Sequence, residues 1–148
     1  MTTSLERVDG ADPELLSLVR AQVAEVMERY ATDDPGPEVA ETTPFLLARL
    51  DGEPVGCVAV APLGPGTGEL KRMYVAPVAR GRGLGRVLLE AAERMAAEQG
   101  HRLLRLETGT EQPEAVALYE RSGWTRIPCY GHFADDPRTI CLEKALPG

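Results

Sequence analysis

Apolar residues recur at helical spacing in three stretches of the chain. The first stretch, residues 15–30, follows Asp12-Pro13-Glu14, in which a capping side chain, a proline and an acidic residue predict a helix start. The second stretch begins at Leu84 and ends before Gly100, and the third covers residues 113–122. The pattern therefore predicts three helices, separated by segments of a different period.

Short runs of β-branched, aromatic and other apolar residues fill the space between these helices. Two of the runs flank Asp51-Gly52, a dipeptide typical of tight hairpins, and should pair antiparallel. A Pro/Gly turn over residues 62–68 then leads into a third run, which completes a three-stranded meander. The predicted strands cover residues 4–8, 45–50, 55–61, 69–75, 103–106, 124–127 and 139–144.

Length and composition are those of one folded domain, which we predict to span residues 1–148. The chain is 43% hydrophobic and 26% charged, which gives it enough apolar material for a core. Its first residues do not form a basic, apolar leader, and no run reaches the roughly 18 apolar residues of a membrane helix. We therefore expect a cytoplasmic protein that has no membrane partner.

Cysteine, histidine and charge patterns argue against several classes of site. The three cysteines (Cys57, Cys129 and Cys141) lack C-x-x-C spacing, and His101 and His132 lack a third ligand at recognisable spacing. We expect neither a disulfide framework nor a bound metal. The net charge of -7 argues against nucleic acid, whose binding depends on basic residues that neutralise phosphates.

A local cationic segment interrupts this acidic chain, with five basic residues and no acidic one between Leu70 and Arg86. It contains the run Arg80-Gly81-Arg82-Gly83-Leu84-Gly85-Arg86, where a predicted strand gives way to a helix. Glycines let the backbone approach a ligand, and the first amides of a helix lack internal partners, so such a turn binds anions. The side chains of Arg80 and Arg82 can add charge-assisted bonds to phosphate oxygens. The run predicts a site for a phosphorylated ligand.

Other phosphate-binding folds fit this run less well. The nucleotide P-loop requires a lysine and a hydroxyl residue that are absent here. A dinucleotide fold requires G-x-G-x-x-G inside an opening βαβ unit, whereas these glycines follow an antiparallel meander. Glu107, about twenty residues further on, has the spacing of the ribose-binding acid of that fold. The dinucleotide fold therefore remains an open alternative.

Two motifs resemble those of the GNAT N-acetyltransferase superfamily. Arg80-x-x-Gly83-x-Gly85 matches its signature R/Q-x-x-G-x-G/A, and Ala115-x-x-Leu118-Tyr119-x-x-x-Gly123-Trp124 is similar to the helix motif that follows it. The resemblance covers about residues 45–144. It implies an α/β (α+β) fold in which a mixed, mostly antiparallel sheet of six to seven strands is splayed between strands 4 and 5, with about four flanking helices.

The resemblance also implies a site for acetyl-CoA as cosubstrate, without a metal. The backbone of Met73-Tyr74-Val75 would pair with the pantetheine arm, and the amides of the turn from Gly81 to Arg86, including Leu84, would hold the pyrophosphate. One position departs from the family pattern. Many members carry asparagine where this chain has Gln112, which puts a side-chain contact from that position to the cofactor in doubt.

Catalytic roles follow from the same resemblance. Tyr119 matches a tyrosine that protonates the leaving thiolate. Glu69 has the spacing of a glutamate base, and Glu107, near the end of the neighbouring strand, is the alternative base or an amine-binding carboxylate. Tyr130 and His132 lie in a late loop that we expect to border the acceptor.

The predicted activity is direct transfer of an acetyl group from acetyl-CoA to a primary amine of a small molecule or peptide in a ternary complex. The sequence contains no evident activated cysteine or serine, so we do not expect a covalent intermediate. A non-catalytic acyl-CoA sensor is the alternative. A second copy of the chain is a candidate partner.

Overall fold

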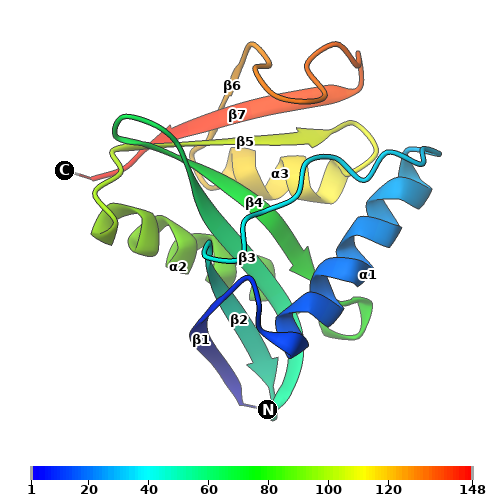
Figure 1. Cartoon of the computed structure of the whole chain (residues 1–148), viewed down its shortest axis with the longest axis vertical. Helices are drawn as coiled ribbons and strands as arrows, with labels where there is room; N and C mark the ends of the chain where they lie inside the picture. Colours follow the sequence, from blue (N-terminus) through cyan, green and yellow to red (C-terminus); the bar gives the residue numbers. More distant parts are fainter. Residues whose placement is uncertain (1, 148) are drawn as a thin grey trace.

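Residues 2–147, which this computed structural model describes, form one seven-stranded sheet between α-helices (Figure 1). The strand order is β1-β2-β3-β4-β5-β7-β6. The elements are β1 (Thr3–Asp9), α1 (Pro13–Arg29), β2 (Pro44–Leu50), β3 (Glu53–Gly64), β4 (Thr67–Val75), the 3-10 turn η1 (Pro77–Ala79), α2 (Leu84–Glu98), β5 (Leu103–Gly109), α3 (Pro113–Arg121), β6 (Thr125–Ile127) and β7 (Thr139–Ala145). The mixed, mostly antiparallel sheet that the sequence predicted is confirmed, with β4 and β5 as its parallel pair.

Helices cover both faces of the central strands. On one face, Leu15 and Leu18 of α1 pack with Phe45 and Leu47 of β2. On the other, α2 and α3 pack in a larger core whose fully buried side chains include Leu88. Because neighbouring residues of β2 point to opposite faces and both faces are covered, the strand is a continuous apolar run instead of an alternating one. Figure 1 shows α1 lying apart from α2.

Several predicted strand boundaries and the predicted number of helices differ from the structure. The turn expected over residues 62–68 is much shorter, because β3 runs on to Gly64 and β4 already begins at Thr67. Pro62 is tolerated within β3 because β2 pairs only as far as Ala59, so the missing N–H faces no second neighbour. The expected four helices are three α-helices and the short η1 turn.

The sheet opens between β4 and β5. These strands pair in parallel register only from Thr67 with Leu103 to Glu69 with Arg105. Beyond that point β4 continues beside β3 as far as Val75, while β5 continues beside β7 as far as Gly109. The two strands therefore diverge, and the predicted splay between them is confirmed.

A β-bulge at Arg72 reorients the end of β4. Between the pairs Cys57 with Tyr74 and Ala59 with Lys71, β4 contains one more residue than β3, and Arg72 has a φ of 55°. Leu70 consequently packs in the α2 core, whereas Tyr74 packs in the α1 cluster, although strict alternation would place them on the same face.

Candidate active site

The glycine-rich run forms an open turn at the start of α2. Gly83 is the residue preceding the helix and has a left-handed conformation with φ 76°, which is unfavourable for residues with a Cβ atom. A Cβ atom at Gly81 or Gly83 would find no other atom within 4 Å, so the backbone borders open space there. The first amides of α2, which have no partner within the helix, face this space. The turn therefore has the geometry of an anion site.

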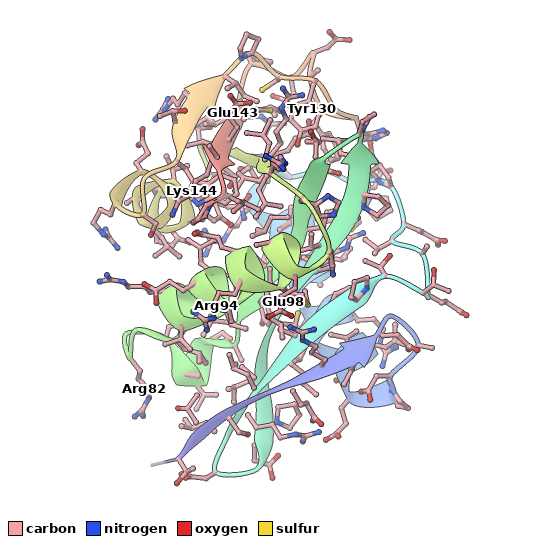
Figure 2. The ribbon with its side chains drawn as sticks, turned by 90° about the vertical axis from the view of Figure 1, so that its left-hand side faces the viewer. Arg82, Arg94, Glu98, Tyr130, Glu143 and Lys144 are labelled. Atoms are coloured by element: carbon pink, nitrogen blue, oxygen red, sulfur yellow. The ribbon has the colours of Figure 1, made fainter. Side chains whose placement is uncertain are left out.

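Arginine side chains around the turn have other partners than the sequence suggested. The guanidinium of Arg80 donates to both carboxylate oxygens of Glu25 at 2.7 and 3.0 Å and to the Val75 carbonyl at 2.8 Å. It ties the turn to α1 and to the end of β4. Arg86 pairs with Glu90 at 3.0 Å. Figure 2 shows Arg82 extending outward from the segment before α2. Backbone amides are thus the main anion-binding groups that the turn offers.

A long cleft leads from this turn toward the gap in the sheet. Its walls come from Met73, Tyr74 and Val75 of β4 on one side and from Ala115, Leu118 and Tyr119 of α3 on the other, with the glycine turn at one end. Gly85 permits the close approach of α2 to α3, since a Cβ atom there would lie 3.3 Å from Leu118 Cδ2. An anionic end group at the turn and a narrow arm along β4 would both fit this cleft.

A second cavity, of about 190 Å³, lies at the other end of the gap. Residues from α1, β4, β5 and the segments 32–37 and 133–139 line it. Apolar side chains from α1, such as Val23 and Met27, form part of its wall. Its volume is below the range of about 300 to 1,000 Å³ that is usual for larger ligands, which indicates a small molecule or a single side chain.

Tyr119 lies where the two cavities meet. Together with Met73 and Gln112, it lines both of them. Its side chain is 4% exposed and packs against Trp124, with ring centroids 5.8 Å apart. Within residues 2–147 its hydroxyl has no hydrogen-bond partner. Burial raises the pKa of Tyr119 well above its usual range, so the phenol stays protonated and can donate a hydrogen bond.

The side chain of Gln112 forms a hydrogen bond with another residue that lines the second cavity. Its Oε1 accepts a hydrogen bond from the Tyr30 hydroxyl at 3.1 Å. The departure from the family pattern at this position thus coincides with an internal contact between α1 and the start of α3.

Two of the carboxyl groups that line the second cavity, those of Glu69 and Glu107, have different surroundings. Both oxygens of Glu69 are engaged, Oε1 by Lys71 Nζ at 3.2 Å and Oε2 by the Tyr130 hydroxyl at 2.8 Å. Glu107, further along β5, has a buried Oε2 with no partner among residues 2–147. Burial, and then the charge of Glu69, raises the pKa of Glu107, while a backbone bond from Phe133 opposes the shift.

The loop after β6 covers Glu107 and positions the other predicted residues. Gly131 approaches so closely that a Cβ atom there would lie 2.3 Å from Glu107 Oε1. Tyr130, at the upper end of the molecule in Figure 2, reaches Glu69. His132 Nε2 lies 2.9 Å from Asp34 Oδ2 and joins this loop to the segment after α1. Neither Tyr130 nor His132 is among the residues that line the cavity.

Sequence reasoning missed several residues of this cavity. Gln22 belongs to a helix face that reads as amphipathic, and Arg72 reads as an ordinary strand arginine. Nothing in the local sequence predicts that Arg72 is the bulged residue. The position of Asp34 opposite His132 depends on a loop without periodicity.

We also drew expectations about disulfides, metal sites and membrane helices from the sequence. All three cysteines there are free thiols, and burial raises the pKa of Cys57 to about 12. Among residues 2–147 there is no group of three His, Cys, Asp or Glu side chains arranged to hold a metal. The helices of this part are all too short or too polar to cross a membrane.

Comparison with known proteins matches the chain to one family. The model of the acetyltransferase (GNAT) family matches residues 15–124. The chain is 44% identical to IAA acetyltransferase of Azospirillum brasilense over 103 residues, which cover 69% of this chain and 67% of that protein. A curated Escherichia coli relative is matched over 62% of its length. The chain thus spans about two thirds of the length of these curated relatives.

Solved structures show the same fold. A Klebsiella pneumoniae protein assigned as an acyl-CoA N-acyltransferase superposes with a TM-score of 0.84 at 33% identity, covering 99% of both chains. A GNAT family acetyltransferase of Elizabethkingia anophelis, solved with acetyl-CoA bound, superposes with a TM-score of 0.74 at 21% identity, covering 97% of this chain and 98% of that one.

Proposed function

Because this chain belongs to the GNAT acetyltransferase family and is therefore an acyltransferase, we propose that it transfers an acetyl group from acetyl-CoA to a primary amine of a small molecule or peptide. The observation that carries this proposal is the meeting of two cavities at Tyr119 and Met73, in the gap between β4 and β5. One cavity offers an anion-binding turn and a narrow cleft, and the other offers carboxyl groups. The arrangement suits direct attack in a ternary complex.

Acetyl-CoA supplies the activated acetyl group when it is bound. The amides from Gly81 to Arg86 would hold its pyrophosphate, and β4 would align its arm, because β4 has no neighbour on the side of the gap after Glu69. The Val75 carbonyl already accepts from Arg80, so pairing at this residue shares that edge with the arginine.

Tyr119 would donate its phenolic proton toward the departing sulfur. Its hydroxyl has no internal partner within residues 2–147 and faces the junction of the two cavities, which leaves it available for this bond. The raised pKa keeps the donor protonated. Closing the site around ligands would exclude water and strengthen the bond.

The proton of the amine would pass to a carboxylate. The sequence favoured Glu69, but its two oxygens are already bonded to Lys71 and Tyr130. Glu107 has an unpartnered oxygen and a pKa raised toward that of an amine, which is the usual adaptation of a general base. We therefore place Glu107 as the base. Glu69 positions Lys71, and its charge raises the pKa of Glu107.

Several wider predictions belong to this proposal. A single acetyltransferase domain, a cytoplasmic location and pairing with a second copy of the chain remain predictions from the sequence. The non-catalytic sensor is the less favoured alternative, since a sensor does not require a donor and a carboxyl group at the junction.

The test is release of free thiol from acetyl-CoA across a panel of amines, with the mass of each acceptor measured before and after reaction. We expect turnover with at least one primary amine and a mass increase of one acetyl group. Glu107→Gln should lose more of kcat than Glu69→Gln. Tight CoA binding without turnover on any amine would favour the sensor.

A further inference from the structure

Four buried polar atoms of the side chains lack a hydrogen-bond partner among residues 2–147, and all four belong to residues that line the second cavity. They are Gln22 Oε1 on α1, Arg72 Nε on β4, and Glu107 Oε2 and Thr108 Oγ1 on β5. Native proteins satisfy most of their buried polar groups, so an exception calls for an explanation. Four exceptions that converge on the second cavity indicate a polar ligand that completes their hydrogen bonds.

Arg72 gives this cavity a positive charge that no nearby acid balances. Its Nη2 donates to the Pro37 carbonyl at 2.8 Å, and no carboxylate of residues 2–147 lies within 4.0 Å of it. Glu38, on the exposed segment after α1, acts on it only from a distance. The other two cations of the cavity are matched, Lys71 by Glu69 and Arg138 by Asp136.

The chemistry of the Arg72 guanidinium indicates which kind of ligand group would pair with it. A guanidinium presents donors in a planar fork that fits a carboxylate, and it stays charged when partly buried. Burial lowers the pKa of Arg72, because the guanidinium loses hydration and no carboxylate of residues 2–147 lies close enough to form an ion pair with it. An anionic group in the cavity would supply that partner.

The same cavity offers a second, opposite charge. Glu107 and Glu69 both line it, and the pKa of Glu107 is raised first by burial and then by the charge of Glu69. A cation between them would relieve this repulsion. One small molecule that carries an ammonium and a carboxylate would therefore pair with both the glutamates and Arg72.

From these contacts we infer that the acceptor is a small amino acid, whose carboxylate pairs with Arg72 while its amine lies beside Glu107. Gln22 and Thr108 would complete the polar shell, and Val23, Val26 and Met27 of α1 would contact an apolar side chain. The inference rests on the proposed acetyl transfer and narrows its acceptor. It excludes an amine of a protein side chain, which carries no adjacent carboxylate.

The experiment compares each amino acid with its own carboxamide, for example leucine with leucinamide, so that the carboxylate is removed and the side chain is kept. For the wild-type protein kcat/KM should be about 10- to 100-fold higher for the acid, the range expected for one charge-assisted hydrogen bond. Arg72→Gln should abolish this preference, mainly through KM. Arg72→Lys, which keeps the charge, should retain part of it. Neither variant adds backbone strain, because arginine, glutamine and lysine are equally disfavoured at a φ of 55°.

The other possible results distinguish a failure of this inference from a failure of the proposed function. Equal turnover of acids and amides, or an undiminished preference in Arg72→Gln, would overturn the inference and leave the proposed acetyl transfer standing. Faster turnover of phosphoethanolamine than of β-alanine would replace the carboxylate by a phosphate and also overturn it. If no acceptor is acetylated, the proposed function fails. The shift in melting temperature that leucine and leucinamide cause in the presence of CoA then decides whether the cavity binds the carboxylate.

Discussion

Replacing Tyr119 with phenylalanine removes one oxygen atom from the junction of the two cavities. The ring is retained, and so is its contact with Trp124, whose centroid lies 5.8 Å away. Within residues 2–147 the hydroxyl forms no hydrogen bond, so the substitution breaks none in the folded protein. We expect the free energy of unfolding to be no lower than that of wild type, because a buried hydroxyl without a hydrogen-bond partner does not stabilise the fold.

The expected loss of activity comes from the lost interaction of the hydroxyl with the departing sulfur alone. A positioned general acid contributes about 10²- to 10⁴-fold to a rate. The raised pKa of Tyr119 makes complete transfer to a thiolate unfavourable, since the pKa of a free thiol is about 8.5. The phenol therefore acts mainly as a hydrogen-bond donor to the sulfur, and the lower end of the range applies. A 10²-fold fall in kcat corresponds to about 2.7 kcal/mol of transition-state stabilisation.

Tyr30→Phe is the matched control, because it makes the same change in the same cavity at a hydroxyl that does have a partner. Loss of the bond to Gln112 should lower stability by about 1 kcal/mol and reduce kcat far less than Tyr119→Phe does. The assay is a single-turnover measurement of acetylated product, with calorimetric CoA affinity and melting temperature alongside. A Tyr119→Phe protein with wild-type kcat, where chemistry limits turnover, would falsify the assignment of Tyr119.

Three further predictions test the cofactor turn, the buried acid and the core. Gly85→Asp should weaken CoA binding at least about 10-fold more than Gly85→Asn, because the two have similar shapes and only aspartate repels the pyrophosphate; equal affinities by calorimetry would contradict this. Glu107→Gln should raise the melting temperature relative to wild type by an amount that grows as the pH rises above about 4.3, the ordinary pKa of a glutamate, since a raised folded pKa removes stability as pH rises through it; a difference that stays constant with pH would be inconsistent with the buried charge. Glu93→Ala should cost about 1 to 3 kcal/mol in chemical denaturation, because Lys144 and Trp124 lose their carboxylate.

The periodic parts of the fold could be predicted because local chemistry specifies them. The start of α1 is set by Asp12, whose side chain accepts from the Leu15 amide at 3.0 Å, and the sequence contains that cap. The hairpin of β2 and β3 follows from Asp51-Gly52, both of which have positive φ values. The end of β3 could not be predicted in the same way, since Pro62 usually marks a turn and is permitted in β3 only by the absence of a second neighbour.

The cleft at the glycine turn could be predicted further than the second cavity for a similar reason. The glycine turn and α3 each lie within one short motif, so spacing along the chain reflects their arrangement in space. The second cavity combines α1, β4, β5 and two loops that are distant in the sequence. Its contacts, such as His132 with Asp34, join loops whose composition carries no periodic signal.

Arg72 shows where reasoning from the sequence stops and reasoning from the structure begins. Its role in the cavity depends on the bulge, because a regular strand would alternate Lys71, Arg72 and Met73 across the sheet. The bulge lets Met73 face the cleft at the glycine turn and the α2 core while Arg72 reaches the segment after α1. One irregular residue thus serves both cavities. Since arginine gains nothing from a positive φ, the cost of that conformation is most simply explained by the site it builds, which is why we select Arg72 to determine the acceptor.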